Sequence, residues 1–140
     1  MKTGKLRYIV RDFPVESIHP HAFKAAEATH CARDQGKYWE MHDLLFSNQR
    51  ALGASDLANH ARALGLDAGV FQTCLASGKH ATRIRRDLAE GEKGGVRGTP
   101  TFMLGATDSG ATVRVLRLIR GAQPASAFKA AIDGVLATSK

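Results

Sequence analysis

The two cysteines are the side chains of this sequence best suited to redox chemistry, but they are far apart. Cys31 and Cys74 are separated by 43 positions, and no Cys-x-x-Cys occurs in the 140 residues. Thiol–disulfide exchange needs a low-pKa thiolate, commonly at a helix N-terminus, with a resolving thiol nearby. Cys31 falls late in an expected helix, where the helix dipole disfavours an anion, and Cys74 falls in mid-helix. A catalytic or sensing pair is therefore the weaker interpretation, beside free buried thiols.

Histidines could add metal chemistry, because six are present. His19 and His21 form an H-x-H pair, and His30 adjoins Cys31. A zinc site usually shows paired cysteines or histidines at helical i, i+4 spacing, and no such set appears. His30 and Arg33 flank Cys31, but neighbours at these offsets do not face it on a helix. We expect no metal site and no cofactor.

A third feature is the stretch VRGTPTFML at residues 96–104, in which a proline heads an apolar run. Proline cannot donate to a sheet ladder, so it belongs at the first position of a strand or on an edge. On the residues alone, Pro100 starts a strand and shapes the sheet.

Alternating and helical hydrophobic patterns predict an α/β chain with a block of helices between strands. Ser55 and Asp67 are expected N-caps, and Gly36 and Gly65 are expected to end helices. The predicted elements are a strand at 6–11, helices at about 21–35, 37–48, 55–64, 68–77 and 79–92, strands at 101–104 and 112–119, and a last helix that begins at Pro124.

The two late strands are expected to pair antiparallel across a turn at 105–110, with a bulge where the alternation fails. On the second helix, Tyr38, Trp39, Met41 and Phe46 are expected to pack into the core, so that Trp39 is substantially buried. A peptide groove is the alternative interpretation of these side chains.

Length and composition are those of one globular domain: 44% of the residues are hydrophobic and 24% are charged. No apolar run is long enough to cross a membrane, and the first residues lack a signal peptide's apolar region. This chain is expected in the cytoplasm, or outside it if an export signal lies upstream. The net charge of +7 makes nucleic-acid binding a candidate function. The basic residues are scattered and no aromatic residues lie between them, which argues against a groove for single-stranded nucleic acid.

Four segments in order resemble the DsbA-like branch of the thioredoxin superfamily, thiol–disulfide oxidoreductases with a helical insertion. TGKLRYIVRDFP is similar to the strand after the active-site helix, and VRGTPTF to the cis-proline loop. HPHAFKAAEATHCARDQGKYWEMHDLLFSNQ is similar to the start of the insertion, and GAQPASAFKAAID to the closing helix. The resemblance implies a single domain over 1–140, with the helical insertion at about 19–93.

The resemblance also implies that a strand and a Cys-x-x-Cys helix should precede this segment, so the thioredoxin sheet is incomplete here. Unpaired inner strand edges are costly and invite pairing. Three solutions stay open: a second copy completes the sheet by dimerisation, a separate N-terminal segment completes it, or the two halves close directly.

Only part of the family's site can be transferred to this chain. Gly98, Thr99 and Pro100 match the cis-proline loop, whose backbone pairs with an extended substrate in the family. Some members carry a second disulfide in the insertion, which implies a Cys31–Cys74 bridge as the alternative to free thiols. The family's catalytic cysteines have no counterpart here.

We therefore expect a thiol–disulfide oxidoreductase domain that is not redox-active as an isolated chain. Its partners would be thiol-containing or unfolded proteins. The alternatives are a redox-inactive peptide-binding or dimerisation module and, third, a basic nucleic-acid-associated protein.

Overall fold

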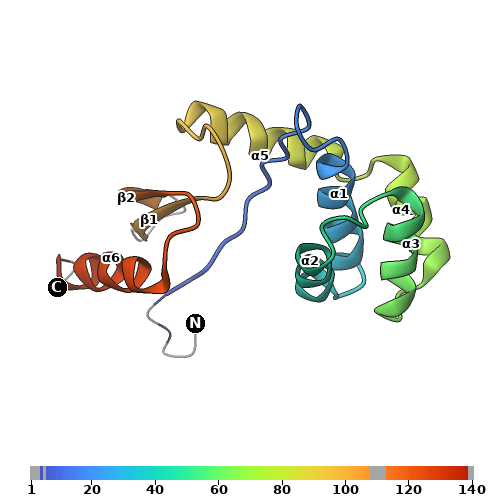
Figure 1. The fold of residues 1–140 in the computed structure, drawn as a ribbon, viewed down its shortest axis with the longest axis horizontal. Coiled ribbons are helices and arrows are strands. Elements are labelled where there is room, and N and C mark those ends of the chain that lie inside the picture. The colour runs from blue at the N-terminus through green and yellow to red at the C-terminus, as the bar shows by residue number, and fades with distance from the viewer. Residues whose placement is uncertain (1–3, 5, 108–112, 139–140) are drawn as a thin grey trace. The chain divides into compact units, whose positions relative to one another are not determined.

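The computed structural model describes residues 4, 6–107 and 113–138 (Figure 1). It divides into two compact units, residues 1–93 and 94–140, which are described separately below. The first unit is helical, and the second contains a hairpin and a helix.

The five predicted helices of the first unit are confirmed. Their bounds are α1 Ala22–Arg33, α2 Tyr38–Ser47, α3 Ala54–Ala63, α4 Ala68–Ser77 and α5 Ala81–Lys93. Asp67 caps α4 as predicted, because its carboxylate accepts a hydrogen bond from the Val70 N–H at 2.8 Å. The prediction for Ser55 is wrong: Gly53 is the N-cap of α3, and its N–H donates to the Asp56 carboxylate at 3.0 Å. The acidic side chain in the first turn thus satisfies the N–H of the N-cap residue, as the N3 residue does in a capping box.

The core of this unit lies where α1 packs against α2 and α4. Its largest completely buried apolar side chains are Phe71, Met41 and Leu57. The buried hydrophobic cluster consists of Ala28, Cys31, Ala32, Met41, Leu45, Leu57, Ala61, Leu66, Phe71 and Leu75.

The predicted strand at residues 6–11 is wrong, because this segment has no regular secondary structure. Tyr8 and Ile9, which would lie on opposite faces of a strand, are both about half exposed. A strand is defined by its ladder of hydrogen bonds. In the part of the chain that the structure describes, the sheet contains only β1 and β2, so residues 6–11 are not in it.

In the second unit, β1 (Thr101–Thr107) pairs antiparallel with β2 (Val113–Arg120), as predicted. The predicted bulge is confirmed by a register shift between Leu104 and Gly105. β1 continues to Thr107, so the turn predicted at 105–110 begins too early, and its last positions lie outside the described residues. Helix α6 (Ala125–Thr138) packs on β1. The Phe102 and Phe128 rings meet edge to face there, with 4.7 Å between the ring centres.

Candidate functional site

The structure joins Cys31 and Cys74 in a disulfide, so the interpretation as free thiols is wrong. The bond links α1 to α4, with 5.9 Å between the two Cα atoms. Cys31 is only 2% exposed, whereas Cys74 is partly buried at the edge of the core. The disulfide is therefore a cross-link inside the helical unit, with one sulfur atom on a partly accessible residue.

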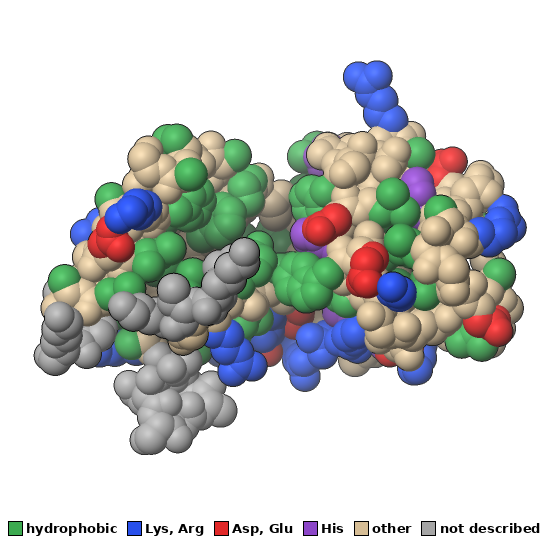
Figure 2. All heavy atoms as spheres, turned by 90° about the horizontal axis from the view of Figure 1, so that it is seen from below, with side chains coloured by type: hydrophobic (Ala, Val, Ile, Leu, Met, Phe, Trp, Pro, Cys, Tyr) green, Lys and Arg blue, Asp and Glu red, His purple; other side chains and the backbone are tan. Residues whose placement is uncertain are grey.

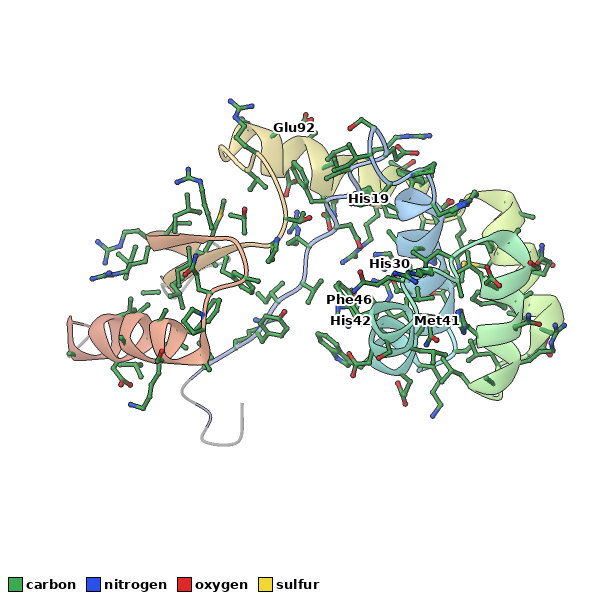
Figure 3. All side chains as sticks on the ribbon, in the orientation of Figure 1. His19, His30, Met41, His42, Phe46 and Glu92 are labelled. Atoms are coloured by element: carbon green, nitrogen blue, oxygen red, sulfur yellow. A yellow bond between two sulfur atoms is a disulfide. The ribbon has the colours of Figure 1, made fainter. Side chains whose placement is uncertain are left out.

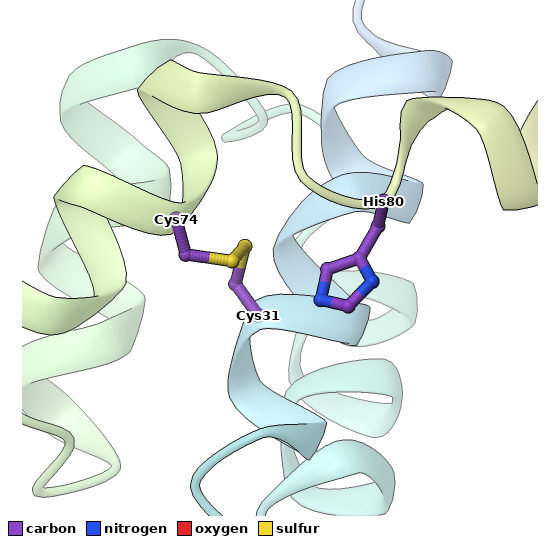
Figure 4. A group of neighbouring side chains, drawn as sticks. All are labelled: Cys31, Cys74 and His80. Carbon is purple, nitrogen blue, oxygen red and sulfur yellow. A yellow bond between two sulfur atoms is a disulfide. The ribbon is translucent and has the colours of Figure 1, made fainter.

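A histidine that the sequence did not single out lies beside this disulfide. His80, just before α5, points toward the Cys31–Cys74 bond (Figure 4), and its side chain is buried. One ring nitrogen of His80 and the two sulfur atoms all lie within 4.8 Å of one another. No spacing rule links positions 31, 74 and 80, and only the packing of α1 against α4 brings them together.

Asp34 holds the His80 ring in place. Its Oδ2 lies 2.8 Å from Nε2 of His80 and 2.7 Å from Nζ of Lys79. Partial burial raises the pKa of the Asp34 carboxyl, but the hydrogen bonds and positive charge of Lys79 and His80 outweigh it. The net result is a pKa below the usual value. Asp34 is therefore a carboxylate that the folded state keeps charged.

A second buried histidine lies next to the first. The ring centres of His30 and His80 are 5.5 Å apart, and Nε2 of His30 lies 2.6 Å from Oδ2 of Asp12. Burial, and then the negative charge of Asp12, raise the pKa of the neighbouring Tyr38 phenol. We call Asp12, His30, Asp34 and His80 the buried polar cluster, in which the two histidines are buried and Asp34 lies at the exposed edge. All four side chains contribute hydrogen bonds beside a disulfide in a mainly apolar helical unit.

The loop 98–100 belongs to the second unit. The Thr99–Pro100 peptide bond is cis, and both residues are exposed, while Gly98 is half-buried. Thr101 Oγ1 donates to the Gly98 carbonyl at 2.7 Å, and the Gly121 N–H donates to the Pro100 carbonyl at 2.8 Å. Among the described residues, β1 pairs only with β2, so its other edge is free of strands.

The prediction that Trp39 is buried is wrong, because its side chain is 47% exposed, and Phe46 is 65% exposed. Met41 and Leu45 fill the core from the opposite side of α2, as Figure 3 illustrates with Met41 and Phe46. The Trp39 ring stacks on Tyr8, with 6.0 Å between ring centres. A helix at the edge of a cluster can bury only one face, and the sequence did not show which aromatic side chains lie outside it.

On the face drawn in Figure 2, Lys and Arg side chains occur at several places, with Asp and Glu side chains among them. Arg11, for example, forms ion pairs with Asp87 at 2.8 Å and with Glu90. None of the helices in the described parts of the chain has the length and apolar character needed to cross a bilayer.

Comparison with known proteins gives two findings. Residues 1–133 match the protein family described as Thioredoxin. The chain is also 43% identical over 99 residues to a protein named Na(+)/H(+) antiporter NhaA 1 of Salinispora arenicola, a match that covers 71% of this chain and 15% of that protein. Over the same length it is 42% identical to NhaA 3 of Salinispora tropica and 40% identical to NhaA of Herminiimonas arsenicoxydans. The chain thus spans about 15% of the length of these relatives, and no solved structure matches it.

Proposed function

Since this chain belongs to the thioredoxin family and carries no Cys-x-x-Cys, we propose that it is a substrate-contacting domain of thiol–disulfide exchange whose reactive pair lies outside these residues. Its helices and two-stranded antiparallel sheet are those of a thioredoxin-like domain with an incomplete sheet. The family match over residues 1–133 is the observation that carries this proposal.

The state of the cysteines supports a non-catalytic role for this pair. Cys31 is almost completely buried, and it lies in the last turns of α1, where the helix dipole disfavours a thiolate. A reactive cysteine is normally found in a partly exposed, electropositive position. These features favour a structural disulfide between Cys31 and Cys74 over a catalytic one.

The loop 98–100 supports a role in binding extended polypeptide. Thr99 and Pro100 are exposed just before β1, and β1 has an edge that no described strand occupies. An extended segment can add to such an edge through main-chain hydrogen bonds. Met103, which is 42% exposed, offers an apolar contact beside it. The proposed ligand is an unfolded or thiol-containing protein segment.

Fluorescence polarisation of a labelled, unfolded cysteine-containing peptide titrated with the full chain tests this role. Thr99→Pro removes a backbone N–H from the loop, so we expect it to weaken binding at least about tenfold, since proline has no donor. Thr99→Ser keeps that N–H and should bind like the unmodified chain. Absence of binding by the unmodified chain, or equal binding by Thr99→Pro, would contradict the proposal. Binding that falls steeply with salt would instead favour a nucleic-acid-type electrostatic surface.

A second candidate function rests on the relatives' names. Because three relatives that share 40% to 43% identity with this chain are named Na(+)/H(+) antiporters, the domain could act beside an antiporter of that class. Affinity purification of the tagged full chain from detergent-solubilised membranes tests this idea. Enrichment of an antiporter over a mock purification would support it, and its absence from the eluate would argue against it.

A further inference from the structure

We propose that, once the Cys31–Cys74 disulfide is reduced, the two thiolates and His80 form a binding site for Zn²⁺. Disulfide formation and metal binding would then exclude each other at the same two sulfur atoms. This site is independent of the loop 98–100 and of the peptide binding proposed above.

The geometry in Figure 4 carries the proposal. Cys31, Cys74 and His80 come from α1, α4 and the start of α5, and all their ligand atoms lie within 4.8 Å of one another. Thiolate sulfur and imidazole nitrogen are the ligands that Zn²⁺ prefers. Once the disulfide is reduced, the two sulfur atoms are free to separate to about 3.8 Å, which is the spacing of two thiolates on a tetrahedral zinc at about 2.3 Å.

The surroundings would hold these ligands in place without the disulfide. Ala28 on α1 and Phe71 and Leu75 on α4 belong to the same buried cluster as Cys31. Oδ2 of Asp34 lies 2.8 Å from Nε2 of His80 and holds the ring where it is. With three protein ligands, the fourth zinc position is left to water, as in sites that remain open.

The chemistry balances with a dithiol as the reductant. The dithiol gives two electrons and two protons to the Cys31–Cys74 bond, which becomes two thiols, and the dithiol becomes a disulfide. Zn²⁺ then displaces one proton from each thiol and binds the lone pair of a His80 ring nitrogen, and the proton that a charged His80 carries is released to solvent.

Metal titration of the full chain tests the site. The chain is reduced with a dithiol, freed of it by gel filtration without oxygen, and titrated with Co²⁺, whose visible spectrum reports tetrahedral thiolate ligation, and then with Zn²⁺. We expect one metal ion per reduced chain, none on the oxidised chain, and displacement of Co²⁺ by Zn²⁺. Cys31→Ser/Cys74→Ser should abolish the thiolate–cobalt bands.

The contribution of the histidine separates this site from two cysteines that merely bind metal as a pair. His80→Ala leaves the disulfide intact and should weaken zinc affinity of the reduced chain on the order of 100-fold, since one ligand of three is lost. His19→Ala, at an exposed histidine of the H-x-H pair, is the matched control and should change nothing. If reduction loosens the fold, zinc should restore the circular dichroism of the unmodified chain but not that of His80→Ala. Equal affinities of the unmodified chain and His80→Ala, or equal binding by the oxidised chain, would overturn the proposal.

Discussion

The Asp12 carboxylate lies 2.6 Å from Nε2 of His30, and both side chains are almost completely shielded from solvent. This hydrogen bond ties the irregular segment before α1 to α1 itself. It lies within the buried polar cluster, whose His30 ring also lies against the rings of His80 and Tyr38.

Removal of the Asp12 carboxylate should destabilise the chain. Asp12→Ala leaves Nε2 of His30 buried without its acceptor, which costs about 1–3 kcal/mol in the free energy of unfolding. Asp43→Ala is the matched control, because Asp43 contacts His42 in the same way at 2.9 Å but is 77% exposed. Its effect should stay within about 1 kcal/mol. Urea denaturation measures both variants, and equal losses would contradict the importance of burial.

Loss of the disulfide should destabilise the chain more strongly. The bond closes a loop between positions 43 apart, for which the chain-entropy relation gives about 4 kcal/mol. Denaturant unfolding should show this loss in the Cys31→Ala/Cys74→Ala variant and a similar loss for the unmodified chain in reductant. Unchanged stability in both would mean that the bond does not form in solution.

Acid should remove the stability that Asp34 contributes. Its folded-state pKa is lower than the unfolded value of 3.8, so the contribution is fully present above that value and is lost as the pH falls through the lower folded pKa. Asp34→Asn removes the charge at every pH. The difference in unfolding free energy between the two proteins should therefore shrink on acidification below 3.8. A difference that stays constant or grows in acid would contradict this assignment.

The bulge in the hairpin should tolerate no side chain at Gly105. A Cβ there would lie 2.5 Å from the Arg114 carbonyl oxygen, and backbone cannot move away cheaply. Gly105→Ala should destabilise the hairpin by about 1–3 kcal/mol. Gly134→Ala is the control, since an added Cβ on α6 meets nothing within 4 Å and should be neutral or stabilise by up to about 1 kcal/mol. Amide exchange of β1 and β2 measures both, and normal protection in Gly105→Ala would disprove the close approach.

Local patterns predicted the helices because the determinants of a helix lie within the helix. The α4 cap at Asp67 and the apolar spacing of Met41 and Leu45 are both local signals. Residues 6–11 alternate like a strand, but a strand also needs a partner, and alternation cannot supply one. The hydrophobic character of Trp39 likewise predicted a place in the core, whereas the packing of α2 leaves that side of the helix exposed.

The candidate site was less predictable than the fold, because its members meet only through tertiary packing. The Cys31–Cys74 bridge could be anticipated from the resemblance to a family but not from the spacing of the two residues. His80 carries no sequence motif, and its place beside the disulfide follows from the packing of α1 against α4. The buried polar cluster is therefore a finding of the structure.

Oxidation of a dithiol peptide in glutathione buffer tests the central claim most directly, which is that these residues form a substrate-contacting domain without a catalytic thiol pair. The purified chain should give no rate above the buffer, and neither should Cys31→Ser or Cys74→Ser. A rate above the buffer that either substitution abolishes would show that Cys31 and Cys74 are themselves a redox centre, which would contradict their role as a structural cross-link.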